Sequence, residues 1–467
     1  MPRSKRAAAC PCCVADAKPS GAAFSEPSPL ARRLRSWVIR VLASPSRARA
    51  VHHLAEWRRR LTGAPHRIDY FHQVEDPYSH LAAQCLDRLA ERYAVEITPH
   101  LVGRGSTTDI SEPELLRAFA CRDAADVAPG YGLSFPATAT EPKGEQVELA
   151  NRILAATGPG EFGARAVAVG EAVWSGDASA LGALASAHDL AGAGVARARV
   201  EEGNARRSKL GHYSGAMFRY GGEWYWGVDR LHHLERCLEG FGARRGDAPP
   251  VAPRPPVDAG ERRDDGRITL DFFPSLRSPY SAIAYDRTLE LVARTGVALE
   301  LRPVLPMVMR GFRVSFAKGR YITSDTAREA EVEGVPFGRL VDPIGRPVER
   351  CFSLFPWARD QGRGAELLGS FLRAAWAEGV DTSREEGLRQ VVEAAGLSWV
   401  DALEVLDSED WRGELEANRL VLYDQLGLWG VPSYRIRGPA GTPDWSSWGQ
   451  DRLWRVAQVL RERIAAS

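Results

Sequence analysis

The sequence predicts an α/β protein in which one structural plan is used twice. In both halves of the chain, strand-like runs alternate with amphipathic helices. Each half also closes on the pattern W-G-x-D-R-L, at Trp226–Leu231 and again at Trp448–Leu453. A shared pattern at the same end of both halves indicates an internal duplication.

Length and composition are those of an ordinary globular chain. The 467 residues exceed one average domain, and 44% of them are apolar and 26% charged. The net charge of +1 creates no overall field that would draw the chain to nucleic acid, and no apolar run is long enough for a membrane span. Seven cysteines, an odd number spread thinly, argue against a disulfide scaffold and predict a reducing, cytoplasmic compartment.

The N-terminal region divides into a tail and a helical extension. Residues 1–28 combine small residues, proline and scattered charge, which predicts a disordered tail without a signal peptide. Its CPCC stretch at 10–13 lacks the second ligand pair of a zinc site. Residues 29–65 predict one or two basic amphipathic helices broken near Pro45. Such helices either lie on a membrane surface or pack on the domain that follows, and we favour the second interpretation.

Each half begins with a predicted β-α-β unit. The first strands are RIDYFHQV and RITLDFF, and the second strands are AVEITPHLV and VALELRPVL. The helix between them starts at DPYS in one copy and at SPYS in the other. Asp76 and Ser278 both suit an N-cap, and proline suits the first helical position. Such units give parallel neighbouring strands.

The middle of each half is predicted to be helical, and each half ends in two strands and a helix. In the second half the closing strand carries GVPSY, in which Pro432 is a candidate for a cis peptide bond. This order is a thioredoxin-like plan with an inserted helical subdomain. Residues 241–266, rich in proline, glycine and alternating charge, predict an extended, solvated linker between domains at 67–240 and 267–467.

Four segments of the second half resemble the 2-hydroxychromene-2-carboxylate isomerase family, relatives of the kappa-class glutathione transferases among the DsbA-like thioredoxin proteins. They are RSPYS (277–281), AKGRYITSDTAREAEVEGVPF (317–337), GVPSY (430–434) and WGQDRL (448–453). The resemblance is good over 267–465 and weaker over 67–240. It implies two tandem DsbA-like domains, glutathione as cofactor, a small aromatic substrate, and an intramolecular pseudo-dimer of the two halves.

The same resemblance assigns Ser278 to the activation of glutathione. A hydroxyl at the positive end of a helix can stabilise a thiolate, although capping alone also explains a serine there. Redox relatives carry two cysteines where this chain has Ser278 and Ser281, so we expect no dithiol–disulfide exchange.

Further contacts are expected from the predicted fold, the residue types and the resemblance. They are Val431, Pro432, Asp451 and Arg452 for glutathione, and Lys318 and Tyr321 for the substrate. Each position also has a structural interpretation, as a turn, a helix cap or a solvated helix face. The loop before Lys318 departs from the family, because it lacks the asparagine that usually reaches the glutathione site. We expect no metal.

The first half departs much further and predicts a degenerate copy. A carboxylate at Asp76 would repel a thiolate, and Tyr213 stands where we place the counterpart of Pro432. His72, His80 and His212 have no metal-ligand spacing. We therefore expect a glutathione-dependent isomerase, or a related transferase, that acts from the second half on an aromatic conjugated carboxylate. The alternative is a non-redox tandem protein that binds a peptide or metabolite without glutathione chemistry.

Overall fold

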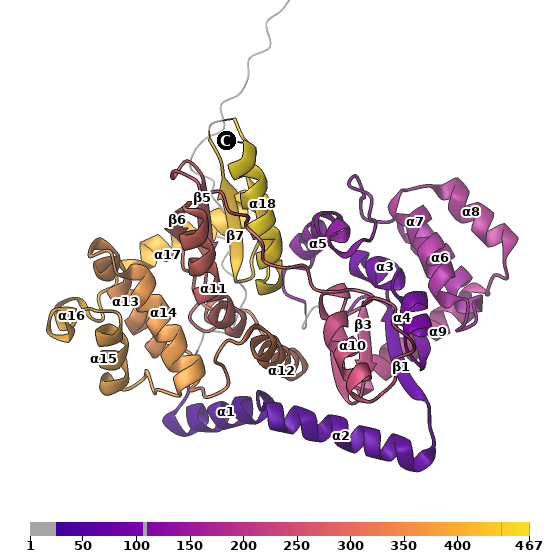
Figure 1. Ribbon diagram of the computed structural model, residues 1–467, viewed down its shortest axis with the longest axis horizontal. Coiled ribbons are helices and arrows are strands. Elements are labelled where there is room, and N and C mark those ends of the chain that lie inside the picture. Colours follow the sequence, from indigo (N-terminus) through magenta and orange to yellow (C-terminus); the bar gives the residue numbers. More distant parts are fainter. Residues whose placement is uncertain (1–24, 106–109, 440, 467) are drawn as a thin grey trace, which may run out of the picture.

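The computed structural model describes residues 25–105, 110–439 and 441–466, which form two four-stranded sheets (Figure 1). The first sheet has the order β2-β1-β3-β4, with β1 His66–His72, β2 Val95–Leu101, β3 Met217–Tyr220 and β4 Glu223–Trp226. The second has the order β6-β5-β7-β8, with β5 Thr269–Phe273, β6 Ala298–Leu301, β7 Ser433–Arg437 and β8 Trp445–Trp448. In each sheet the first pair is parallel and the others antiparallel, which confirms the predicted strand plan.

Helices surround both sheets (Figure 1). Those of the first half are α3 Pro77–Ala83, α4 Leu86–Arg92, α5 Pro113–Val127, α6 Gly144–Ala156, α7 Phe162–Trp174, α8 Ala178–Ala187, α9 Ala193–Lys209 and α10 Leu231–Gly240. Those of the second half are α11 Pro279–Thr295, α12 Phe316–Glu333, α13 Arg346–Asp360, α14 Gly364–Arg373, α15 Glu385–Ala394, α16 Trp399–Val405, α17 Trp411–Leu420 and α18 Leu453–Ala466. The single helix predicted after β1 is two helices, because the chain turns at residues 84–85 between α3 and α4.

The central strands β1 and β5 lie in the two main cores. Tyr70 and Phe71 in β1 and Phe272 in β5 are fully buried, as expected for strands covered on both faces. The cores also meet, because Trp454 of α18 packs into the core of the first half. Gly130 faces that indole so closely that a side chain there would clash with it. The two halves therefore share buried apolar surface.

The N-terminal extension forms two helices, α1 (Pro29–Leu42) and α2 (Pro45–Thr62), which confirms the predicted break near Pro45. They run end to end along the lower edge of the molecule in Figure 1. We predicted that the extension packs on the domain that follows it. Only α2 does so, and its His52 lies 3.3 Å from Glu223. Helix α1 packs instead on the second half, because the buried Arg32 donates to the carbonyls of Asp342 and Ile344 at 2.8 and 2.7 Å.

The linker at 241–266 is not the solvated tether that its composition predicts. Val251 and Ala252 are buried, and their N–H groups donate to Glu235 at 2.8 and 3.3 Å. Arg254 pairs with Glu329 in the second half. Buried acceptors on both halves thus hold this irregular segment down. Most of the predicted tail, including CPCC, lies outside the described residues.

The strand register shows that the predicted counterpart of Pro432 in the first half was wrong. The residue before β3 is Ala216, and the residue before β7 is Pro432. The carbonyl of each accepts from the glycine of a W-G turn, Gly227 at 2.8 Å and Gly449 at 2.9 Å. The counterpart of Pro432 is therefore Ala216 and not Tyr213. Ala216 has a positive φ of 52°, so the backbone is reshaped at this point.

No helix in the described ranges combines the length and apolar character that a membrane crossing would need.

Candidate functional site

Ser278 lies where a helix start meets a cis peptide bond. It caps α11, and its Oγ accepts the N–H of Ser281 at 3.1 Å. The same hydroxyl donates to the carbonyl of Val431 at 3.4 Å. The Val431–Pro432 bond is cis, which confirms that prediction. A hydroxyl, a positive helix end and an open backbone segment are thus brought together.

Polar groups beside Ser278 are available to a ligand. Within the described chain the N–H of Val431 has no hydrogen-bond partner, and the buried Oγ of Ser275 has none either. Val431 and Ser275 both line the cavity described next. Buried polar groups are normally paired, so two open groups at one wall favour a bound polar molecule.

A cavity of about 760 Å³ lies against Ser278, and both halves and α1 form its walls. Its aromatic lining comprises Tyr78, Phe119, Tyr213 and Trp226 from the first half, and Phe316, Tyr280, Tyr321, Trp376, Trp429 and Trp448 from the second. Val38, Ile39 and Leu42 of α1 complete the apolar part. This size and composition suit an organic ligand with an aromatic group.

Lys318 and Tyr321, the predicted substrate contacts, both line this cavity from α12. The Tyr321 hydroxyl is buried without a hydrogen-bond partner among the described residues. Its ring stands edge-on to His212 of the first half, with centroids 5.0 Å apart. Arg35 of α1 adds a second cation, for which the described chain provides no ion pair. The cavity therefore offers positive charge next to an aromatic wall.

Asp451 and Arg452, the predicted glutathione contacts, also line the cavity, but Arg452 is almost fully buried at the boundary between the halves. The Arg452 guanidinium pairs with Asp123 at 2.7 Å and with Asp229 at 2.9 Å. In return, Arg230 of the first half pairs with Asp451 at 2.9 Å. Most donors of Arg452 are therefore already used.

The first half makes the equivalent ion pair to the second half. Arg230 also binds Asp325 of the second half at 2.9 Å, as Arg452 binds Asp123 of the first. Each of these two aspartates accepts a tyrosine hydroxyl of its own half at 2.8 Å, from Tyr280 and Tyr78 respectively. Burial opposes a charged guanidinium, but the facing carboxylates outweigh it and raise the pKa of both arginines well above the usual value. The repeated W-G-x-D-R-L was the sequence signal for this interface, but its partners Asp123 and Asp325 carried none.

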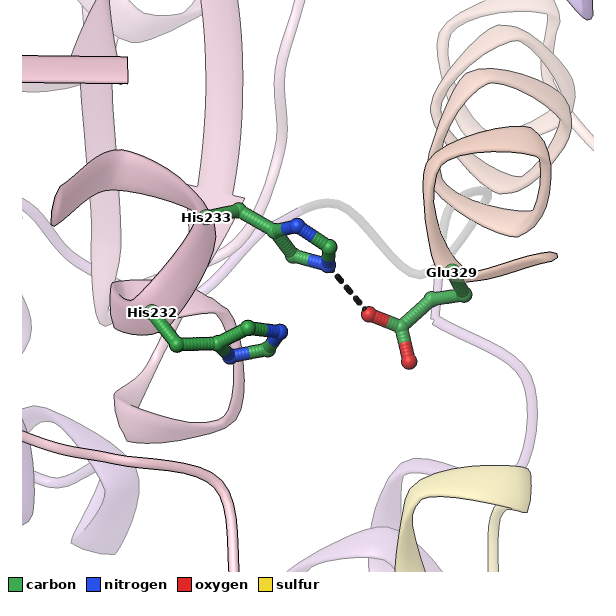
Figure 2. Close-up of side chains that lie close together, drawn as sticks. All are labelled: His232, His233 and Glu329. Carbon is green, nitrogen blue, oxygen red and sulfur yellow. Dashed lines mark hydrogen bonds and ion pairs between the residues drawn. The ribbon is translucent and has the colours of Figure 1, made fainter. Parts of the chain in front are cut away.

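Figure 2 shows a second cluster at the interface, His232, His233 and Glu329, whose possible ligand atoms lie within 4.8 Å of one another. His233 Nε2 is 2.5 Å from Glu329, and Gln450 donates to the other carboxylate oxygen at 2.6 Å. Arg254 and Arg230 lie against the same carboxylate. A cation at this point would face two arginines, so the geometry favours a contact between the halves over a metal site.

The corresponding position in the first half carries a carboxylate in place of the hydroxyl. The Asp76 carboxylate caps α3, accepting from the Tyr78 N–H at 3.3 Å and from Ser79 at 2.8 Å. Burial, partly offset by these hydrogen bonds, raises the pKa of Asp76 to about 6. Gly215 is packed against Gln73 and this carboxylate. Neither Asp76 nor Gly215 lines the cavity beside Ser278, although the neighbouring Tyr78 and Ser214 do.

The three histidines singled out in the first half are buried and do not form a metal cluster among the described residues. Burial lowers the pKa of His72 and His212 to about 3 and that of His80 to about 4. A cavity of about 820 Å³ does lie beside His80. Its described lining contains neither arginine nor lysine, so it offers no cation to an anionic ligand.

Residues 269–461 match the family model described as DSBA-like thioredoxin domain. These residues form a DsbA-like thioredoxin domain. The chain is also 28% identical over 197 residues to a 2-hydroxychromene-2-carboxylate isomerase of Sphingobium xenophagum, a match that covers 40% of this chain and 94% of that protein. The first half contains a sheet of its own, to which the family model does not extend.

Two solved structures resemble part of the chain. A 2-hydroxychromene-2-carboxylate isomerase has a TM-score of 0.35 and 20% identity, covering 43% of this chain and 99% of that one. The cytosolic disulfide reductase DsbM from Pseudomonas aeruginosa with GSH has a TM-score of 0.32 and 16% identity, covering 42% and 98%. Because these scores are low, we draw no conclusion from them.

Proposed function

We propose that the chain is a glutathione-dependent isomerase of the 2-hydroxychromene-2-carboxylate isomerase type, or a related glutathione transferase, acting on an aromatic conjugated carboxylate. One observation carries the proposal. Ser278 and the cis Val431–Pro432 bond stand at the wall of a large aromatic cavity that also contains cations. The distant isomerase relative supports the same reaction class.

The residues around Ser278 suit the tripeptide glutathione. Val431 offers an unpaired N–H to its extended backbone, and Asp451 lies near enough to the cavity to face its amine. When bound, glutathione supplies a thiolate that adds reversibly to a conjugated double bond and so permits rotation about it. Ser278 stabilises that thiolate by turning its hydroxyl proton from the Val431 carbonyl toward the sulfur, assisted by the positive end of α11.

The same cavity would also hold the substrate. Lys318 and Arg35 provide charge for its carboxylate, while Tyr321 offers its unpaired hydroxyl. The aromatic side chains pack against the substrate ring and keep water away from the reacting double bond. The cationic and aromatic lining thus supports an aromatic carboxylate as the substrate.

Cysteine positions support an enzyme without dithiol exchange. The described free cysteines are Cys85, Cys121, Cys237 and Cys351, and none of them lines the cavity. Burial raises the pKa of Cys121 to about 11 and that of Cys85 to about 12, so these thiols stay protonated at neutral pH. Ser278 and Ser281 occupy the place of the redox pair.

We also propose that the two halves are tandem DsbA-like domains that form a pseudo-dimer. The equal strand order of the two sheets supports this, as does the exchange of Arg230 and Arg452 across the interface. The first half then acts as a partner domain that supplies part of the cavity wall. The non-redox binding protein is the second candidate, because that shared wall would equally suit a metabolite bound without glutathione.

A glutathione-dependent assay decides between the two candidates. The proposal predicts that the protein isomerises 2-hydroxychromene-2-carboxylate, or conjugates an aromatic electrophile, only when glutathione is added. It also predicts that Ser278→Asp abolishes this turnover. Tight binding of aromatic acids with no turnover and no effect of glutathione would instead support the binding protein.

A further inference from the structure

Helix α1 presents a stripe of apolar side chains to solvent, in addition to the apolar residues that it places at the cavity wall. The residues that it buries against the second half include Arg32 and Ser36. Its large apolar side chains Leu30, Leu34, Trp37 and Val41 are between 37% and 76% exposed. Leu30 and Leu34 each precede one of the buried residues by two positions, which is about 200° around a helix. The apolar stripe therefore points away from the protein.

Helix α2 likewise has polar side chains facing the protein and large apolar side chains facing solvent. Its inward face carries His52 and the buried Glu56. Leu54, Trp57 and Leu61 are 46% to 66% exposed. With the four residues of α1 they form what we term the outward face, namely Leu30, Leu34, Trp37, Val41, Leu54, Trp57 and Leu61. Helices α1 and α2 lie end to end along one edge of the molecule (Figure 1), and the apolar side chains of both are exposed there.

Positive charge accompanies the outward face. The stretch 29–62 holds nine arginines and one glutamate, whereas the whole chain has a net charge of only +1. Arg33 lies within one helical turn of Leu30 and Trp37, and Arg58 lies within one turn of Leu54 and Leu61. Both arginines are exposed. Apolar side chains, two exposed tryptophans and flanking arginines are the composition of helices that lie in a membrane interface.

We propose that the outward face binds the surface of a lipid bilayer that contains anionic headgroups. The leucines and tryptophans enter the boundary between headgroups and acyl chains, and the arginines pair with the lipid phosphates. A second copy of the chain would bring the same positive face and be repelled. A nucleic acid would neutralise the arginines but leave the apolar stripe in water. No described helix is suited to crossing a bilayer, so the binding is peripheral.

Vesicle flotation with the full-length protein tests this proposal. We expect the protein to float with vesicles of phosphatidylglycerol and phosphatidylcholine, and to bind pure phosphatidylcholine vesicles about tenfold more weakly or worse. Trp37→Ser combined with Trp57→Ser should weaken binding to the anionic vesicles by about tenfold or more. Both side chains are exposed, so thermal stability should stay unchanged. The matched control is Val400→Ser with Leu403→Ser, two exposed apolar residues of α16, which should bind as the wild type does.

Several results would overturn the proposal. One is absence of wild-type binding to anionic vesicles at low salt. Another is equal binding by the double tryptophan variant. A third is binding to duplex DNA or RNA without any binding to vesicles. The last is self-association in sedimentation velocity that the tryptophan variant abolishes, because it would make a second copy the occupant of this face.

Discussion

Ser278 and Asp76 hold equivalent places in the two halves and begin the same kind of helix, so capping does not distinguish them. Their surroundings do. Ser278 is half-buried at the wall of a cavity and shares its hydroxyl with Val431. Asp76 is partly buried as well, but Gly215 packs directly against it and it does not line the cavity. The difference of one side chain therefore coincides with a helix start that lines the cavity and one that does not.

Substitution of Ser278 separates capping from chemistry. Ser278→Asp keeps an N-cap, so we expect a stability close to that of the wild type but a loss of glutathione-dependent turnover of about 100-fold or more. Ser278→Ala loses the cap as well, with a further cost of about 1 kcal/mol in the free energy of unfolding. Ser398→Ala, at the N-cap of the remote α16, is the control that should lose stability alone. Full activity of Ser278→Asp would exclude the proposed role.

Asp76 makes the stability of the protein depend on pH. Its pKa is about 6 in the folded state and about 3.8 when unperturbed. Between these values the folded chain binds more protons than the unfolded chain, so its contribution to stability falls as pH rises. Above pH 6 the partly buried carboxylate is charged and opposes folding.

Asp76→Asn should remove this penalty. We expect a gain of about 2 to 3 kcal/mol in urea unfolding at about pH 8 and almost none at about pH 4. Asp177→Asn, which alters the exposed cap of α8, should show no such pH dependence. An equal effect of Asp76→Asn at both pH values would contradict the assignment.

At the scale of elements, α1 is joined to the second half by a polar anchor. The buried Arg32 donates to two carbonyls in the segment before α13, while Arg33 points to solvent without a described partner. This anchor places Val38, Ile39 and Leu42 at the cavity wall. A helix far from Ser278 in sequence thus shapes its pocket.

Arg32→Ala should loosen α1. Two buried carbonyls lose their donor, which we expect to cost about 2 to 4 kcal/mol in local stability. Limited proteolysis should then cleave the α1–α2 junction near Ser44 faster, and the affinity for the substrate should fall. Arg33→Ala is the matched control and should behave as the wild type does. Unchanged cleavage in Arg32→Ala would show that other contacts hold the helix.

At the scale of the whole molecule, the exchanged arginines connect the halves. Arg452→Met would leave the buried Asp123 and the partly buried Asp229 without their cation. We expect a loss of about 3 to 5 kcal/mol in urea unfolding. Arg389→Met, which removes an exposed pair with Glu393, should barely change stability. A similarly small effect of Arg452→Met would mean that the interface depends mainly on apolar packing.

Local patterns made much of the fold predictable. Alternating strands, the two PYS helix starts and the cis Val431–Pro432 bond all depend on residues close in sequence, and the structure contains them. The contacts between the halves could not be predicted, because Arg230 and Asp451 lie 221 positions apart. For the same reason the sequence did not reveal that the first half and α1 line the cavity. From the sequence we placed the counterpart of Pro432 at Tyr213 instead of Ala216. Residue spacing alone therefore did not give the correct register, which became clear only from the strand pairing.

The most direct test of the central claim is calorimetric titration of the full-length protein with glutathione at neutral pH. The account predicts one bound glutathione per chain, because a carboxylate at Asp76 would repel the thiolate in the first half. It also predicts about tenfold or weaker binding by Ser278→Asp, in which a carboxylate faces the thiol. No binding by the wild type, two equivalent sites per chain, or unchanged affinity in Ser278→Asp would contradict it.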